Sequence, residues 1–308
     1  MQGLERWPRV AALIARAQVA RPPRVGVVYP LSAVALEAAV LAQRDGVMSP
    51  VLYGPEEQML ALAASGNIDL TNAEIVHVAG SARESANVAA QAASAGDVVA
   101  LMKGSLHTDE LLNAVIARAN GLYVRERLSH TFAFDIPGFP RWLLVADAVV
   151  NVSPSLKTKR SIVRNALRVC AALNITTPRV AVVAATEDVN PKVPGTLDAQ
   201  ALVALGLEGE FGDAIIGGPF GMDNAISELA AAIKGIAHPV AGRADVLITP
   251  DLNAGNILYK SLIYLAGAEC AGVILGAKVP IILTSRADSA VSRVASCALA
   301  GVISGDNS

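Results

Sequence analysis

The sequence predicts an α/β protein with largely parallel sheets. Short apolar runs of strand length alternate with Ala-rich helical stretches through most of the 308 residues. Polar residues gather directly after several of these runs, and open parallel sheets bind ligands beyond the carboxyl ends of their strands. An apolar share of 53% is enough to fill two hydrophobic cores. We therefore expect two α/β domains.

Four apolar runs follow a helix expected near the N-terminus, and we interpret them as parallel strands joined by crossover helices. They are Val25–Tyr29, Pro50–Tyr53, Glu74–Val78 and Val98–Met102. Lys103, His107 and Thr108 come directly after the fourth run. This position makes them candidate ligand contacts, although His107 is equally well explained as a surface histidine that opens a helix.

The segment from Leu128 to Pro140 is richer in Phe, Pro and Gly than its surroundings. That composition favours a domain junction or a pair of strands over another helix. Alternation of helix and strand then resumes. The expected elements are a helix at Ser155–Leu173, a strand at Arg179–Ala184, a helix at Thr196–Leu205, a strand at Ala214–Gly217 and a helix at Asp223–Lys234.

A strand at Val246–Ile248 is expected to run into a helix that begins near Pro250–Gly255. Asn253, Asn256 and Lys260 are spaced three and four residues apart, so they share one face of that helix. A helix N-terminus with a nearby ammonium favours anions. The alternative is an Asn cap and a solvated Lys.

A second strand-to-helix turn follows the apolar run Val279–Leu283, and helical character starts again at Ala287. Ser285 and Arg286 lie at this turn. The planar donors of an Arg suit phosphate, which a purely structural turn does not require. Ser285 followed by Asp288 also fits a helix capping pair, which is the structural alternative.

Composition narrows the class of protein. A formal net charge of −2 argues against a nucleic-acid partner, and polar residues interrupt each apolar run before the roughly 18 residues that a membrane span needs. The N-terminal residues lack the apolar centre of a signal peptide, so we expect a soluble, cytoplasmic protein. Cys170, Cys270 and Cys297 are expected to be buried free thiols. The four histidines are scattered, and no metal site is predicted.

Taken together, the motifs resemble those of the phosphate acetyltransferase and phosphate butyryltransferase family. The similarity covers most of the chain from about Arg24 onward, and the Ser-Arg-Ala-Asp-Ser form at residues 285–289 is more similar to the butyryltransferase branch. The motifs are Leu101–Gly104 with His107-Thr108, Leu128–His130, Asn190–Lys192, Gly218-Pro219 with Asp223–Ser227, Pro250–Lys260 and Gly276–Ser289.

This resemblance implies reversible transfer of a short acyl group, acetyl or butyryl, between coenzyme A and inorganic phosphate, giving an acyl phosphate. Transfer would be direct, in a ternary complex, with coenzyme A as a substrate and with no cofactor or metal. Arg286 would hold phosphate, Ser285 would donate to the thiolate or the oxyanion, and Asp288 is a candidate base. Lys103 and Thr108 would contact the phosphoryl end of the substrate.

The resemblance also implies an isocitrate dehydrogenase-like architecture of two α/β/α domains with the active site in the cleft between them. The first domain is expected to comprise residues 1–128 and 275–308, and the second residues 129–274. The second domain would form a homodimer.

Two alternatives belong to other functional classes. A metal-dependent dehydrogenase of the same fold group would need clustered carboxylates and a cofactor site, which the sequence does not display. A noncatalytic or altered relative that binds acyl phosphate or coenzyme A stays open, because Asn113, Gly217 and Ser292 differ from residues common in acetyltransferase relatives. The basic stripe Lys157, Arg160, Arg164 and Arg168 is either a solvated helix face or a contact for the phosphates of coenzyme A.

Overall fold

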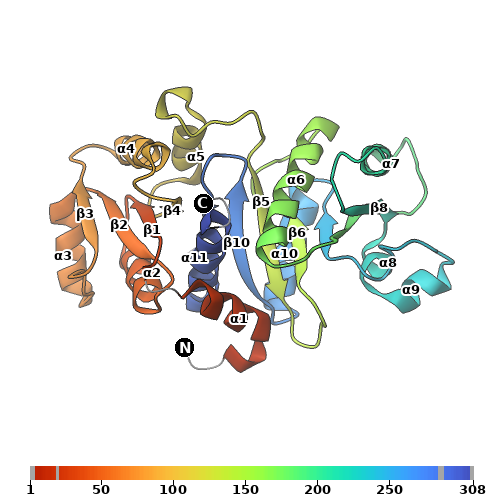
Figure 1. Ribbon diagram of the computed structural model, residues 1–308, viewed down its shortest axis with the longest axis horizontal. Coiled ribbons are helices and arrows are strands. Elements are labelled where there is room, and N and C mark those ends of the chain that lie inside the picture. The colour runs from red at the N-terminus through yellow and green to blue at the C-terminus, as the bar shows by residue number, and fades with distance from the viewer. Residues whose placement is uncertain (1–3, 19–20, 284–287, 306–308) are drawn as a thin grey trace. The chain divides into compact units, whose positions relative to one another are not determined.

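The computed structural model describes residues 4–18, 21–283 and 288–305. The chain separates into two compact units (Figure 1). Unit 1 comprises Met1–Glu126 and Ala271–Ser308, and unit 2 comprises Arg127–Cys270. Both units combine helices with a mixed, mainly parallel set of strands, as the sequence predicted. The expected domain boundaries and the expected location of the active site stay predictions.

The strands of unit 1 lie in the order β3-β2-β1-β4-β11-β10. The first five are parallel to their neighbours, and β10 runs antiparallel to β11. The central side chains of these strands are buried except in β3 at the end of the order, which explains the continuous apolar runs in the sequence. The strands are β1 (Arg24–Val28), β2 (Ser49–Gly54), β3 (Glu74–His77), β4 (Ala100–Lys103), β10 (Glu269–Leu275) and β11 (Ile281–Ile282).

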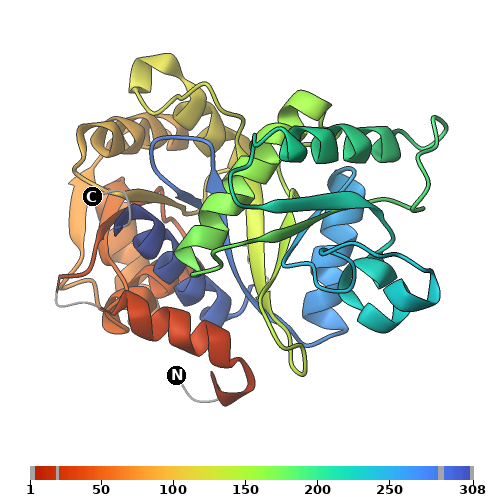
Figure 2. The same cartoon turned by 45° about the vertical axis from the view of Figure 1, so that its right-hand side comes forward.

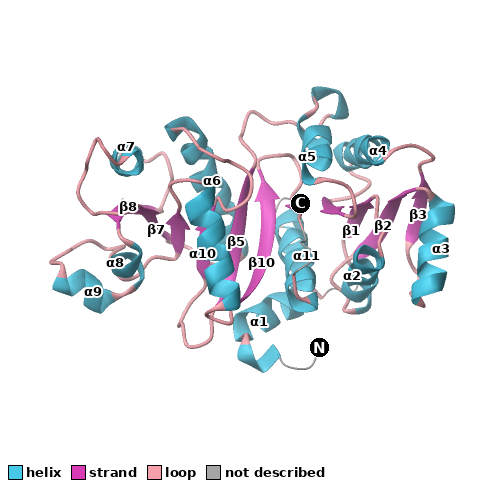
Figure 3. Ribbon diagram, turned by 180° about the vertical axis from the view of Figure 1, so that it is seen from behind, coloured by secondary structure: helices cyan, strands magenta, loops and turns pink. Residues whose placement is uncertain are grey.

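Helices cover both faces of these strands. In Figure 3, α2 and α3 lie on one side of β1–β3, and α4 and α5 lie on the other. The N-terminal helix α1 packs beside the C-terminal helix α11, shown red and dark blue in Figure 2. The helices are η1 (Leu4–Arg6), α1 (Pro8–Ala17), α2 (Ala33–Arg44), α3 (Glu56–Gly66), α4 (Ala82–Ala95), α5 (Thr108–Ile116), η2 (Arg118–Asn120) and α11 (Ala290–Gly305).

The turns that follow β1 and β4 meet at a backbone contact. The amide of Gly104 donates to the carbonyl of Val28 at 2.9 Å, and the amide of Ser105 donates to the carbonyl of Tyr29 at 2.8 Å. A Cβ atom on Gly104 would lie 2.3 Å from the Val28 oxygen and 2.7 Å from the Tyr29 oxygen. Only glycine therefore permits this approach of the two turns.

The strands of unit 2 lie in the order β5-β6-β9-β7-β8. β5 (Ser129–Asp135) lies in the Phe-rich and Pro-rich segment and pairs antiparallel with β6 (Leu143–Ala146) just after it, which agrees with the strand-pair alternative. The other neighbours are parallel. The remaining elements are α6 (Leu156–Ala172), β7 (Arg179–Val183), α7 (Pro194–Leu207), β8 (Ile215–Phe220), α8 (Met222–Ile226), α9 (Glu228–Ile233), β9 (Val246–Ile248) and α10 (Leu252–Tyr264).

One expected helix is instead two. The stretch predicted as a single helix at Asp223–Lys234 divides into α8 and α9 at Ser227. The Ser227 hydroxyl accepts a hydrogen bond from the amide of Ala230 at 3.2 Å and so caps the second helix. Serine is a preferred N-cap residue because its hydroxyl satisfies an amide that lacks a helical partner.

An imidazole lies inside the core of unit 2. His130 on β5 is 0% exposed, and its ring centroid lies 4.0 Å from that of Phe132, which in turn stacks on Tyr259 of α10 at 4.3 Å. Within the described part of the chain, neither ring nitrogen of His130 has a hydrogen-bond partner. Burial lowers the pKa of His130 from 6.5 to about 3, because the imidazolium loses its hydration.

In the part of the chain that the structure describes, no helix combines the length and the apolar character that crossing a membrane requires.

We predict that His130 makes the protein less stable in mild acid. The unfolded imidazole takes up a proton near pH 6.5, whereas the folded one does so only near pH 3. The unfolded state therefore binds more protons between these values, and its free energy falls as the pH is lowered through this window. Urea unfolding should give a smaller loss of unfolding free energy from pH 8 to pH 5 for His130→Phe than for the unaltered protein. Equal losses would contradict the prediction.

We also predict that Gly104→Ala destabilises the fold. Its Cβ must push apart two main chains, and overpacking of this kind typically costs about 1–3 kcal/mol. Gly305→Ala is the matched control, because a Cβ there meets nothing within 4 Å at the end of α11. Thermal unfolding should show a lower midpoint for the first variant and no loss for the second.

Candidate functional site

The strand order of unit 1 reverses between β1 and β4. From β1 the chain moves outward to β2 and β3, and then returns to place β4 on the other side of β1. Connections after β1 and β4 therefore leave toward opposite faces of the sheet. Ligands of open α/β sheets bind outside the carboxyl ends of the strands at such a switch point. Lys103 at the end of β4, and His107 and Thr108 after it, are candidate contacts from the sequence analysis.

Lys103 ends β4 and is held against the turn that it precedes. Its ammonium donates to the carbonyls of Gly104 and Leu106, each at 3.1 Å, and its side chain is half-buried. These contacts limit the freedom of a long side chain, so the positive charge is fixed near the carboxyl end of β4. This arrangement suits recognition of an anion.

His107 and Thr108 begin α5. His107 is exposed at the N-cap, and its amide donates to the carboxylate of Glu110 at 2.8 Å. These features match the interpretation of His107 as a surface histidine that opens a helix. Thr108 is the first helical residue and is half-buried on the same turn as Lys103.

Two serines at the switch point did not emerge from the sequence analysis. The Ser105 hydroxyl donates to the Ser32 hydroxyl at 3.1 Å, which joins the turn after β4 to the start of α2. Ser32 caps α2 by accepting from the amide of Ala35 at 3.3 Å. The N-cap pattern could have identified Ser32. Ser105 carries no comparable local signal, because its partner lies 73 residues away.

The second predicted turn lies partly outside the described residues. Ser285 and Arg286, predicted to act on the thiolate and the phosphate, fall in this undescribed segment, so their roles stay predictions. β11 is parallel to β4 with Ile282 opposite Met102, and the chain after β11 therefore leaves from the same edge as Lys103.

The predicted start of the last helix is wrong, whereas the capping pair of Asp288 with Ser285 includes a residue outside the described ones and stays a prediction. Helix α11 begins at Ala290, later than predicted, and the hydroxyl of Ser289 accepts from the amide of Ser292 at 2.9 Å. Asp288 is half-buried and precedes this cap. Ser292 is buried within α11.

In unit 2, the three predicted residues of α10 do not form one exposed stripe. Asn253 and Lys260 are exposed, whereas the Asn256 amide donates to the carbonyl of Ala148 at 3.2 Å. The N-cap is Asp251, whose carboxylate accepts from the amide of Ala254 at 3.0 Å, so the alternative of an Asn cap is also wrong. This bond gives Asn256 a structural role, and its contact with substrate stays a prediction.

The partner of α10 is the loop after β6, organised by buried Asp147. Its carboxylate accepts hydrogen bonds from the amides of His130, Val149, Val150 and Asn151 and from the Asn151 side chain. The Thr249 hydroxyl donates to the Asp147 carbonyl at 3.0 Å. A Cβ on Gly255 would lie 2.4 Å from that same carbonyl oxygen. The loop and the start of α10 therefore form one interlocked structure.

The basic stripe of α6 is partly neutralised by acidic partners. Arg160 pairs with Glu210 at 2.8 Å, and Arg164 pairs with the same carboxylate. These guanidinium groups lower the pKa of Glu210. Paired arginines are less available to phosphates than the sequence pattern implied.

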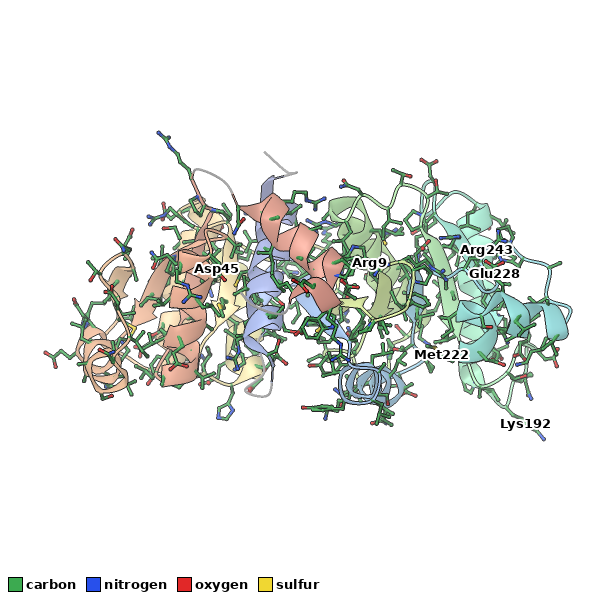
Figure 4. All side chains as sticks on the ribbon, turned by 90° about the horizontal axis from the view of Figure 1, so that it is seen from below. Arg9, Asp45, Lys192, Met222, Glu228 and Arg243 are labelled. Atoms are coloured by element: carbon green, nitrogen blue, oxygen red, sulfur yellow. The ribbon has the colours of Figure 1, made fainter. Side chains whose placement is uncertain are left out.

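A hollow of about 260 Å³ opens in unit 2 beside α9, lined in part by Glu228, His238 and Arg243. Glu228 and Arg243 lie against each other in Figure 4 and form two hydrogen bonds of 2.9 and 3.1 Å. A Cβ on Gly217 would lie 2.7 Å from the His238 ring, so the imidazole occupies the space of a side chain at that position. The same figure shows Lys192 extending away from the ribbon.

Sequence comparisons connect this geometry to known enzymes. Residues 81–301 match the family model described as phosphate acetyl/butaryl transferase. The phosphate acetyltransferase of Rhizobium meliloti is 43% identical over 301 residues, covering 96% of this chain and 95% of the relative. The probable phosphate butyryltransferase of Bacillus subtilis is 42% identical over 288 residues, covering 94% and 95%. These identities do not separate the two branches, so the closer similarity to butyryltransferases stays a prediction.

Structural comparison gives a concordant result. A branched-chain phosphotransacylase from Enterococcus faecalis V583 superposes with a TM-score of 0.81 at 28% identity, covering 92% of this chain and 99% of that one. A 4-hydroxythreonine-4-phosphate dehydrogenase from Klebsiella pneumoniae shares the fold alone, with a TM-score of 0.55 at 13% identity and the same coverage. With most of its length matched by the family model and by relatives above 40% identity, this chain belongs to the phosphate acetyl/butyryl transferase family.

Proposed function

We propose that the protein transfers a short acyl group reversibly between coenzyme A and inorganic phosphate. Family membership over residues 81–301 and 43% identity to an acetyltransferase across almost the whole chain carry this proposal. In the direction of acyl phosphate formation, a phosphate oxygen attacks the thioester carbonyl carbon. The tetrahedral oxyanion then collapses, the carbon–sulfur bond breaks, and the released thiolate takes a proton.

Each charge that is present or develops during this reaction needs a complementary group on the protein. We assign the incoming phosphate to the guanidinium of Arg286, with two parallel hydrogen bonds. Ser285 donates to the oxyanion or to the thiolate. Lys103 and Thr108 support the phosphoryl end, and the position of Lys103 after β4 at the switch point favours this role.

Direct transfer is favoured over an acyl-enzyme. Cys170, Cys270 and Cys297 are all buried. Burial raises the pKa of the Cys170 and Cys297 thiols, so neither is poised as a thiolate nucleophile. We therefore propose attack by phosphate itself within a ternary complex. Asp288, which lies outside α11, is our candidate for the group that exchanges a proton with the thiol.

Asn253 and Lys260 remain candidates for contacts with the polar parts of coenzyme A, because both are exposed on α10. Asn256, which also ties α10 to the loop after β6, stays a third candidate. His107 is kept as a peripheral candidate at the start of α5.

We further propose a cytoplasmic homodimer formed through unit 2. Helix α10 exposes Ile257 at 66%, Tyr264 at 67% and Leu265 beyond its end at 86%. Large apolar side chains gathered on one helix support an interface with a second copy. The mass in solution tests this assignment.

The reaction is tested by measuring free thiol after mixing the protein with an acyl-CoA and phosphate. We expect phosphate-dependent release of thiol from both acetyl-CoA and butyryl-CoA, with butyryl-CoA used at least as well. A reaction without phosphate is the control for hydrolysis. Thiol release that ignores phosphate, or no release with either substrate, would overturn the proposed function.

The role of Arg286 is tested by Arg286→Lys, which keeps the charge and loses the planar pair of donors. We expect a loss on the order of 2–4 kcal/mol of transition-state stabilisation, so kcat/KM should fall at least about tenfold. Arg44→Lys, at an exposed position on α2, is the matched control. Unchanged turnover and phosphate KM in Arg286→Lys would remove this residue from the site.

A further inference from the structure

Unit 1 has a pocket of its own near β3, the last strand in its strand order. It has a volume of about 600 Å³ and is lined by the segment after β3 and by one face of α4. β3 is the last strand at this end of the order, and Figure 3 shows α4 over the neighbouring β1 and β2. This volume lies within the usual range for small-molecule sites. Its chief lining residues are His77, Gly80, Glu84, Asn87, Val88 and Gln91.

A buried amide fixes how two of these side chains are oriented. Asn120 is 5% exposed and donates to the Asn87 carbonyl oxygen at 2.8 Å. Its own oxygen accepts from the Gln91 amide nitrogen at 3.2 Å. Because the two ends of an amide point in opposite directions, Asn87 turns its NH₂ group away from Asn120, and Gln91 turns its oxygen away. The pocket face of α4 thus carries an ordered donor and an ordered acceptor, four residues apart.

Two more groups at this pocket have an assigned hydrogen-bonding character. His77 accepts at Nδ1 from the amide of Glu56 at 3.2 Å, which leaves Nε2 as the donor of the ring. One carboxylate oxygen of Glu84 accepts from the amide and hydroxyl of Ser81. The other oxygen remains an acceptor. Aliphatic surface comes from Val78 and Val88.

This arrangement matches a flat heterocycle that carries an amino group beside a ring nitrogen. The Gln91 oxygen would accept from the amino group, and the Asn87 NH₂, one helical turn away, would donate to the ring nitrogen. Adenine presents this pair of groups on its edge, and Asn or Gln side chains recognise it in this way. We propose that the pocket between residues 77–80 and α4 binds an adenine ring.

Adenine could come from a free nucleotide or from coenzyme A, and the second source rests on the proposed function. All strands from β3 to β4 are parallel, so the pocket and Lys103 lie at the same edge of the sheet. Three strand spacings separate them, about 14 Å in all. The diphosphate and pantetheine arm of coenzyme A are long enough to connect an adenine and a thiol over that distance.

The first test is binding of adenosine, measured by calorimetry on the full chain. Asn87→Asp keeps the oxygen that accepts from Asn120 but replaces the NH₂ donor, so adenosine should bind at least about tenfold more weakly. Asn72→Asp adds the same charge at an exposed position outside the pocket. Inosine, which has a carbonyl in place of the amino group, should also bind more weakly. Equal binding of adenosine and inosine, or of adenosine to both variants, would overturn the proposal.

The second test identifies the source of the adenine. If coenzyme A is the source, the ratio of the KM for acetyl-CoA to the KM for acetyl-pantetheine should rise at least about tenfold in Asn87→Asp relative to Asn72→Asp, and adenosine should compete with acetyl-CoA. If a free nucleotide is the source, adenosine should change turnover without such competition. The binding test needs no turnover, so failure of the proposed function and failure of this site are distinguishable.

Discussion

The contact of Gly104 with the backbone after β1 is the constraint on which the candidate site depends. Two main chains meet there with no room for a Cβ atom, which brings the turns after β1 and β4 together at the point where the strand order reverses. Lys103 gains a fixed position from the same turn, because the carbonyls of Gly104 and Leu106 hold its ammonium. A position that only glycine can occupy thus sets the location of a cation.

Unit 2 uses a buried carboxylate for a comparable purpose. The Asp147 carboxylate accepts hydrogen bonds from amides of the loop after β6. The start of α10 packs against that loop through hydrogen bonds of Thr249 and Asn256 and the close approach of Gly255. An ionised group is stable in such a place only when donors surround it, and here five do. The polar residues of this segment therefore divide into those that build the loop and those, Asn253 and Lys260, that remain exposed.

The same division explains why local patterns gave uneven results for the site. Helical spacing correctly placed Asn253, Asn256 and Lys260 on α10. The spacing could not indicate that Asn256 bonds to the Ala148 carbonyl, because Ala148 lies 108 residues away in the sequence. The basic residues of α6 looked like an anion surface, and Glu210 from beyond α7 pairs with two of them. The last helix was expected to start near Ala287, and the Ser289 hydroxyl caps it at a later position. In each case a distant or adjacent partner competed for the same group.

By itself, the sequence determined the α/β class, most strands and helices and the family, because hydrophobic periodicity and contiguous motifs are local properties of the chain. Tertiary structure alone decided the strand order, and with it the switch point at Lys103. It also decided the pairing of Ser105 with Ser32 and the orientation of Asn87 and Gln91 by Asn120. These features join residues that are dozens of positions apart, and no local pattern encodes which of them will meet when the sheet forms.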